Sequence, residues 1–552
     1  MLDKSLFDVC VIGSGPAGIT ALLELESEGL KVLLVESGSN SFNNNIQSNS
    51  DAVITNTENH APMNEATRVQ LGGTSLIWGG RCVPLDSIDF QARNFVENSG
   101  WPISFDEINK YYPKACKYSL CGESVFSSLS SESRIKGGIT PSMKDSNVLS
   151  SSLERWSLPL NFWAKYRSKI ECSSNIEVLT NFTCTKINFE NTNDHVSSIS
   201  VSNIKGIQKK IHSKFYVLAC GGLETTRLLL DSNDVHEKGI GNKSGLLGKF
   251  YMGHISGKIS SIKFTKDIDK VSYGFEKDND GIYCKKRFTL SESEQNKSKL
   301  LNFSAWIDHP LIGDHTHGSG FLSLSYIALS TPILGKFLAP DAIIRFAKES
   351  NPDGSRVGHI KNICFDFHKL LFKIPFFIWK RFIQKRKLPG VQIFSKIGSY
   401  PLHYHAEHSP NKKSMVSLSD EKDQLGRRRL LIDFNFLNVD INNVINNHQI
   451  IDNYLRENNL GYLDYVKKNL NKEVFQQARD GFHQMGTTRM SKEIKDGVVD
   501  TNCRVHGTKN LYVASSSVFP TSGQANPTLT IVALSIRVAN KIKIILKPKL
   551  DS

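Results

Sequence analysis

The chain has 552 residues and a formal net charge of +14 at neutral pH, and 39% of its residues are hydrophobic. This length exceeds what one hydrophobic core supports, so we expect at least two domains. No run of about 18 apolar residues occurs, which excludes a membrane-spanning helix by composition. The positive charge comes with no recognition motif for nucleic acid, so no nucleic-acid partner is expected.

A glycine-rich loop follows the first predicted strand. Apolar residues 7–12 lead into Gly-Ser-Gly-Pro-Ala-Gly at 13–18. Gly13 permits a tight turn, Gly15 lets the backbone approach a pyrophosphate, and Gly18 allows a helix to pack closely on the strand. This pattern predicts a dinucleotide site.

The residues after the loop complete the nucleotide-binding unit. A helix is predicted over 19–28 and a second strand over 31–35, which ends at Glu36. A carboxylate at this position accepts hydrogen bonds from ribose hydroxyls and would repel a 2′-phosphate. NADP is therefore disfavoured, and FAD or NAD remains.

Further glycine-rich and polar segments follow along the first half of the chain. The asparagine-rich segment 40–49 and the serine-rich segment 124–133 are predicted to be surface loops or lids. Between them, Arg-Val-Gln-Leu-Gly-Gly-Thr-Ser-Leu-Ile-Trp-Gly-Gly at 68–80 forms a second glycine-rich loop. Residues 216–229 combine an apolar strand with the start of a helix.

The middle of the chain is predicted to form an antiparallel sheet. Apolar and polar residues alternate in four segments, 258–264, 281–290, 301–308 and 390–405. The turn Asp-Gln-Leu-Gly at 423–426 predicts a hairpin. We expect this sheet to cover the nucleotide site.

A basic and aromatic segment interrupts this region. Residues 367–387 contain seven lysines and arginines among bulky apolar side chains, and residues 326–338 and 343–346 are also unusually apolar. Such a composition suits the interface of an anionic membrane, with bulky side chains at the acyl boundary. It equally suits a core helix with a solvated basic end.

Histidines cluster at His403, His405 and His408, next to Glu407. Two of them, at 403 and 405, would face the same side of a strand, as two metal ligands could. A turn after the strand explains the rest of the cluster equally well, and we expect no metal site.

Two C-terminal blocks complete the pattern: Phe-His-Gln-Met-Gly at 482–486 and Phe-Pro-Thr-Ser-Gly-Gln-Ala-Asn-Pro-Thr-Leu-Thr at 519–530. With the three earlier blocks, they resemble the glucose-methanol-choline (GMC) oxidoreductase family, whose members bind FAD and oxidise alcohols. Residues 72–78 and 515–520 are most similar to its sugar-oxidising branch, the pyranose oxidases and the fructose and gluconate dehydrogenases.

The resemblance implies an α/β fold with a discontinuous Rossmann-type FAD-binding domain. It also implies a substrate domain with a large, mainly antiparallel sheet and helices, as in p-hydroxybenzoate hydroxylase. The expected FAD-binding domain comprises residues 1–110, 175–255 and 476–552. A lid or connecting segment is expected at 111–174, and a substrate-binding domain at 256–475 with a basic aromatic insertion near 325–390.

The chemistry of alcohol oxidation needs a base near neutral pKa and a polar group that orients the hydroxyl. The resemblance assigns these roles to His483 and Asn526, with hydride passing to the flavin. A histidine held in a glycine-rich turn and an asparagine that caps the helix predicted over 529–538 are the structural alternatives.

The resemblance also implies the residues that contact the cofactor. They are Gly13, Gly15, Pro16, Ala17, Gly18, Glu36, Ser37, Arg68, Gly72, Gly73, Thr74, Trp78, Gly79, Ala219, Ser515, Ser516, Pro527 and Thr528.

Three positions depart from the family pattern. Ile77 stands where pyranose oxidases carry a flavin-linking histidine, so we expect non-covalent FAD. Ser515 and Gly253 each stand where many relatives have an aspartate.

The resulting prediction is an FAD-dependent oxidoreductase that oxidises a CH–OH group of a sugar or related alcohol. The electron acceptor is oxygen, a quinone or another carrier, and residues 367–387 suggest a lipid-linked or membrane-proximal substrate. The alternative is a flavin-bound protein without net alcohol oxidation, in a structural or binding role or with lyase or isomerase chemistry. Ten scattered cysteines and a first strand that begins within seven residues predict a cytoplasmic protein, peripheral at a membrane.

Overall fold

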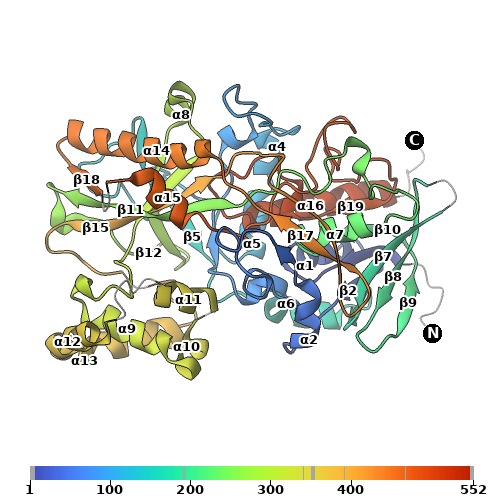
Figure 1. Ribbon diagram of the computed structural model, residues 1–552, viewed down its shortest axis with the longest axis horizontal. Helices are drawn as coiled ribbons and strands as arrows, with labels where there is room; N and C mark the ends of the chain where they lie inside the picture. The colour runs from blue at the N-terminus through green and yellow to red at the C-terminus, as the bar shows by residue number, and fades with distance from the viewer. Residues whose placement is uncertain are drawn as a thin grey trace.

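The computed structural model describes residues 7–190, 193–339, 341–349, 355–390, 392–465 and 468–547. These residues form an elongated molecule with one large sheet in each half (Figure 1). A group of helices, α9 to α13, lies beside the second half, at the lower left of the view.

A parallel sheet forms the first half. Its order is β19-β10-β1-β2-β6, with bounds Leu511–Val513, Ser213–Leu218, Phe7–Ile12, Val32–Glu36 and Ile176–Thr180. The helices α1 (Pro16–Glu26) and α16 (Thr528–Leu546) pack against each other, and α7 (Gly222–Asp231) follows β10. Strands β1 and β2 are almost wholly apolar and buried, as expected for a sheet covered on both faces. The sheet therefore collects strands from three distant stretches of sequence.

A smaller antiparallel sheet extends this half. It contains β7 (Thr183–Phe189), β8 (Val196–Ser202) and β9 (Gln208–Ile211). Four further helices lie between β2 and β6 in the chain: α3 (Met63–Ala66), α4 (Phe105–Asn109), α5 (Tyr112–Tyr118) and α6 (Phe162–Cys172). Of these, α5 packs on α16 and α6 packs on α1.

An eight-stranded antiparallel sheet forms the second half. Its path is β18-β11-β15-β14-β13-β5-β4, with bounds Gly461–Tyr465, His254–Phe264, Ser399–Glu407, Phe303–Ile307, Tyr283–Leu290, Val148–Trp156 and Arg81–Cys82, and β12 (Glu276–Lys277) pairs with β13. The long helix α14 (Asn438–Glu457) packs on this sheet through Ile441, Val444 and Ile451. The helices α8 (Glu292–Ser298) and α15 (Leu470–Gln477) flank it. The predicted α/β class, with a Rossmann-type parallel sheet and a large antiparallel sheet, is confirmed.

Some predicted elements differ from the observed ones. The strand expected over 390–405 begins only at Ser399, and the segment 111–174, expected as a lid or connection, contributes β5 to the large sheet. Within the segment predicted as a loop at 40–49, residues Asn44–Gln47 form α2, capped by Asn43. The serine-rich segment 124–133 is tied to β5 by a bridge between Ser127 and Ser152. Local composition did not reveal these pairings because their partners lie elsewhere in the chain.

The insertion between β14 and β15 is helical. It contains α9 (Gly320–Ser330), α10 (Pro332–Leu338), α11 (Asp341–Glu349), α12 (Arg356–Phe365) and α13 (Phe367–Ile378), followed by a π-helical turn, Trp379–Ile383. In the described part of the chain no single helix has the length and hydropathy to cross a membrane. Among the described helices, only α9 and α10 taken together reach that length and hydropathy, and they are bent by 109° at their junction.

The predicted hairpin at 423–426 is present. It joins β16 (Met415–Lys422) to β17 (Arg428–Asp433), and β17 also pairs in parallel with β3 (Val53–Ile54). Asp423 N donates to Arg427 O at 2.9 Å, and Gly426 takes the left-handed conformation, with φ of 79°, that the turn requires. The hairpin therefore connects the second half of the molecule to the first.

Candidate active site

The glycine loop has the geometry of a pyrophosphate cradle at the start of α1. Gly13 has φ of 103°, and a Cβ there would lie 2.5 Å from Ala219 O. A Cβ on Gly18 would overlap Gly13 O, whereas a Cβ on Gly15 would have no atom within 4 Å. Gly15 thus leaves the helix N-terminus open for an anionic ligand.

Glu36 is held rigidly at the end of β2. Its Oε2 accepts from Ser14 N at 2.9 Å and from Ser14 Oγ at 2.7 Å, and its Oε1 accepts from Gly38 N at 2.8 Å. Burial raises the pKa of Glu36, and these hydrogen bonds oppose the rise. A carboxylate offers about four acceptor positions, so one remains for a ribose hydroxyl.

One cavity of about 500 Å³ runs from Glu36 past the glycine loop to His483 and Asn526. Its size falls within the ordinary range for ligand sites. All predicted cofactor residues line it except two, Gly18 and Gly72. Those two glycines act on the backbone: Gly18 packs against Gly13, and a Cβ on Gly72 (φ of 97°) would lie 2.5 Å from Asn161 Oδ1. The open glycine, the fixed carboxylate and the continuous cavity fit a dinucleotide. Their assignment as individual contacts stays a prediction.

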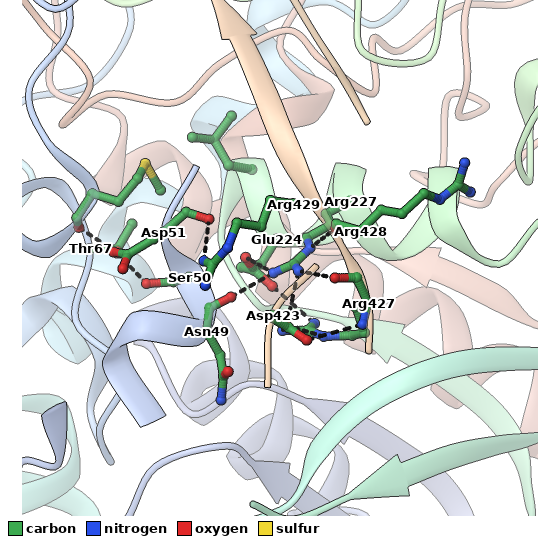
Figure 2. Close-up of polar contacts among 12 residues, drawn as sticks. Asn49, Ser50, Asp51, Thr67, Glu224, Arg227, Asp423, Arg427, Arg428 and Arg429 are labelled. Atoms are coloured by element: carbon green, nitrogen blue, oxygen red, sulfur yellow. Dashed lines mark hydrogen bonds and ion pairs between the residues drawn. The ribbon is translucent and has the colours of Figure 1, made fainter. Parts of the chain in front are cut away.

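One wall of the cavity is formed by residues that were not predicted from the sequence. Asn49, Ser50, Glu224 and Arg427 line it there. Figure 2 shows that Arg427 reaches this wall from the β16–β17 hairpin, whereas Glu224 comes from α7.

A network of arginines fixes the hairpin to this wall (Figure 2). Arg427 donates from Nη1 to Glu224 Oε2 at 3.2 Å and from Nε to Asp423 Oδ2 at 3.0 Å. Arg227 donates to the same Asp423 oxygen at 2.9 Å and to Asn49 O at 2.6 Å. We call this hairpin turn, residues 423–429, the arginine clasp. The sequence feature that could have indicated this network is the run of three arginines, 427–429, after the predicted turn.

The second end of the cavity holds the predicted catalytic pair. Asn526 Nδ2 and His483 Nε2 lie 2.9 Å apart, and Arg81 Nη1 donates to Asn526 Oδ1 at 2.8 Å. Arginine is only a donor, so it fixes the amide with Nδ2 toward the histidine. His483 Nε2 is then an acceptor, and the ring proton lies on Nδ1. The structure brings the two residues together. Arg81 from β4, which was not predicted from the sequence, orients the Asn526 amide and through it selects the tautomer of His483.

Asp480 holds the other side of His483. Its Oδ2 lies 3.1 Å from His483 Nδ1 and accepts from His254 N at 2.6 Å, and its Oδ1 accepts from Phe482 N at 2.9 Å. Burial alone would raise the pKa of Asp480, but the charge and hydrogen bond of His483, together with the backbone N–H of His254, lower it to about 2. An ionised carboxylate therefore orients the ring through Nδ1. Its position three residues before His483 was the missed signal.

Asp480 also accounts for the missing acid at position 253. A Cβ on Gly253 would lie 2.8 Å from Asp480 Oδ2. Asp480 thus places a carboxylate close to where the side chain of an aspartate at position 253 would begin.

Two further imidazoles surround the pair. His254 Nδ1 lies 3.0 Å from His483 Nδ1, and the His254 and His405 rings are 4.1 Å apart. Burial lowers the pKa of both His254 and His405, so both are neutral. The donor nitrogens of His254, His405 and His483 lie within 4.8 Å of one another, a grouping that could hold a metal ion.

The histidine cluster considered from the sequence does not converge. His403 Nδ1 bonds Asp308 Oδ2 at 3.0 Å, His408 Nε2 bonds Asn435 O at 3.0 Å, and Glu407 pairs with Arg93. Of these residues only His405 faces the catalytic pair. The others hold the sheet and its following turn in place.

Comparison with known proteins agrees with this geometry. The model of the GMC oxidoreductase family matches residues 410–535, and that of the pyridine nucleotide-disulphide oxidoreductases matches residues 7–244. Paromamine 6'-oxidase of Streptomyces fradiae is 21% identical, over 98% of this chain and 92% of its own length. The fructose dehydrogenase large subunit of Gluconobacter japonicus is 42% identical over only 60 residues, 11% of each chain. A fungal aryl-alcohol oxidase structure aligns with a TM-score of 0.55 at 13% identity, covering 99% of this chain and all of that one.

Proposed function

Because the chain belongs to the GMC oxidoreductases, which are FAD-dependent enzymes, we propose that it oxidises a CH–OH group of a sugar or a related alcohol. The observation that carries this proposal is the His483–Asn526 contact at the end of the dinucleotide cavity. Alcohol oxidation requires a base and an oriented amide, and a substrate oxygen placed between Nε2 and Nδ2 would replace the hydrogen bond that now joins them. The relative that acts on paromamine supports a sugar-like substrate.

The residues of the site divide the work of the reaction. A substrate hydroxyl would take the place of the Asn526 contact, donate its proton to His483 Nε2 and accept from Asn526 Nδ2. Asp480 stabilises the resulting imidazolium through Nδ1, and Arg81 keeps the Asn526 amide oriented. FAD, when bound, supplies the acceptor for the hydride. His254 and His405 stay neutral and add no competing charge.

FAD is proposed to bind without a covalent link. Ile77 lines the cavity where a linking histidine stands in pyranose oxidases, and an alkyl side chain offers no atom for attachment. Retention then depends on the glycine loop, Glu36 and the arginine clasp.

We also propose that the helical insertion contacts the surface of a membrane. Large apolar side chains are exposed on several of its helices, among them Ile333 at 87%, Phe337 at 78%, Phe365 at 80% and Phe372 at 81%. Residues 367–387 include seven basic residues and no acidic one. Exposed apolar groups beside unopposed positive charge suit an anionic lipid surface better than a protein core.

The insertion also reaches the cavity. Ile343 of α11 is 49% exposed and lines the same cavity as His483. A membrane-proximal or lipid-linked alcohol, or a quinone as electron acceptor, would therefore enter beside the insertion. The cytoplasmic location expected from the sequence stays a prediction.

Two measurements test these proposals. Flavin reduction is followed by absorbance under anaerobic conditions with a panel of sugars and alcohols, and then with oxygen or an artificial acceptor. His483→Ala should slow reduction at least about a hundredfold, and an unchanged rate would remove the assignment. Bound flavin that no alcohol reduces would favour the alternative of a flavoprotein without alcohol oxidation.

Flotation with liposomes tests the membrane contact. The wild type should float with anionic vesicles and not with neutral ones, and a variant with Phe365→Ser, Phe372→Ser and Lys373→Gln should not float. A matched change at exposed residues away from the insertion, Ile204→Ser and Ile207→Ser with Lys210→Gln, should float as the wild type does. Equal flotation of the two variants, or none with the wild type, would contradict the proposal.

A further inference from the structure

A row of nearly buried charges lies on the face of the large sheet beside the catalytic pair. Lys285 of β13 is directly opposite Glu154 of β5, and Arg81 of β4 forms an ion pair with the same Glu154. Directly opposed residues lie on one face of a sheet, so Lys285 and Arg81 flank Glu154. Lys285 is 2% exposed and Glu154 is fully buried.

Arg81 connects this row to the reaction site. Its Nη1 donates to Asn526 Oδ1, and its guanidinium lies over the ring of Trp306 at 4.5 Å. Arg81 also lines the same cavity as His483 and Asn526, so a ligand held by Arg81 would lie beside that pair.

Several polar atoms of this row have no partner among the described residues. Arg81 Nη2, Glu154 Oε1 and Arg287 Nε are buried without a hydrogen bond. The described residues provide no hydrogen bond for the Lys285 ammonium either, and it lies 5.0 Å from the centre of the Phe275 ring. Proteins rarely leave such groups unsatisfied, and grouped exceptions point to a ligand.

The charge of the row is unbalanced. Glu154 pairs with Arg81, and Asp308 pairs with Lys258 at 2.9 Å. Lys285 is left without a carboxylate in contact, and burial lowers its pKa to about 8. A buried cation without a counterion is costly unless a ligand supplies the negative charge.

The geometry points to a subsite for an anionic group, in which Lys285 and Arg81 Nη2 bind the oxygens of a carboxylate or a phosphate. The inference rests on the proposed function, since it makes the substrate an alcohol that carries such a group, for example a sugar acid or a sugar phosphate. Charge-assisted hydrogen bonds from lysine and arginine to these oxygens are the strong ones. Glu154 Oε1, an acceptor beside them, suits a hydroxyl of the same molecule.

Titration of the oxidised, FAD-loaded protein with sodium acetate and with inorganic phosphate tests the subsite, with the flavin absorbance and calorimetry as readouts. We expect saturable binding of at least one anion, weakened tenfold or more in Lys285→Met. Lys263→Met, which removes an exposed lysine of β11 paired with Asp464, should bind as the wild type does. Tighter binding of acetate indicates a carboxylate, and tighter binding of phosphate indicates a phosphoryl group.

Absence of saturable anion binding, or equal binding by Lys285→Met, would overturn the subsite. The test is independent of turnover, because His483→Ala should bind the anions normally. The two ideas can fail separately. If His483→Ala loses flavin reduction but the wild type binds no anion, the proposed function stands and the subsite is refuted. The rate of flavin reduction can also be compared among glucose, glucuronate and glucose 6-phosphate. We expect one of the two anionic sugars to reduce the flavin faster than glucose does. A faster reduction by an amino sugar than by any of these three would contradict the subsite.

Discussion

Replacing Asp480 by Asn should slow flavin reduction while leaving the fold intact. The carboxylate orients His483 through Oδ2, which also accepts from His254 N, and its Oδ1 accepts from Phe482 N. An amide keeps only one of these two acceptor oxygens and carries no charge. The change therefore removes the charge and one acceptor, and leaves a side chain of the same size.

The structure gives the magnitude. The pKa of Asp480 falls from 3.8 to about 2, and at 1.36 kcal/mol per unit this corresponds to about 2 kcal/mol of favourable coupling with its surroundings, to which His483 contributes most. If that coupling is lost as His483 becomes protonated, the rate should fall roughly thirtyfold. Because the folded pKa is lowered, the contribution is complete above pH 4 and is lost only as the pH falls from about 3.8 to 2. The effect should thus persist across the neutral range.

Anaerobic stopped-flow absorbance measures the rate between pH 5 and 9. Asp464→Asn, which removes an exposed carboxylate on β18, serves as the control and should behave as the wild type. A wild-type rate with an unchanged pH profile in Asp480→Asn would refute the reasoning. Circular dichroism and the flavin spectrum exclude loss of the fold as the cause.

Three further predictions concern the cofactor, the subsite and the glycine beside Asp480. Arg427→Met should raise the FAD dissociation constant roughly tenfold, measured by flavin fluorescence after dilution, because the clasp loses its ion pairs with Glu224 and Asp423; an unchanged constant would detach the clasp from FAD retention. Lys285→Met should raise the thermal midpoint at pH 7, since a pKa lowered from 10.5 to about 8 represents a cost of roughly 3 kcal/mol. The charged groups that face the ammonium are Glu154, Asp308, Lys258 and Arg81. Because the folded pKa is lowered, the cost is complete below pH 8 and disappears by about pH 10.5. An equal gain in the thermal midpoint at pH 7 and pH 10 would contradict this prediction. Gly253→Asp should destabilise the protein more than Gly253→Ala in chemical unfolding, because both clash with Asp480 and only the first adds a like charge; equal losses would argue against the displaced carboxylate.

Local patterns in the sequence predicted the parts of the site that depend on short segments. The glycine loop and Glu36 lie within one strand–helix–strand unit, where the spacing of residues fixes the geometry. His483 and Asn526 were each identified from a block, and the structure brings them together. The hairpin at 423–426 was likewise visible because turn chemistry is local.

The surroundings of these residues were not visible. Arg81, Asp480 and His254 act on the pair from β4, from the loop before His483 and from β11, and no local rule predicts which of many charged residues meets a given histidine. Gly253 illustrates the limit: the sequence shows an acid lost, whereas the fold shows another acid in its place.

The sequence by itself determined the class of fold, the nucleotide loop and the identity of the two catalytic candidates, because each is encoded in a continuous segment. Only the tertiary structure decided the protonation of His483, the clasp over the far end of the cavity and the unpaired charge of Lys285. These depend on contacts between residues up to hundreds of positions apart, such as Arg81 with Asn526, and on burial, which sets the pKa of each group.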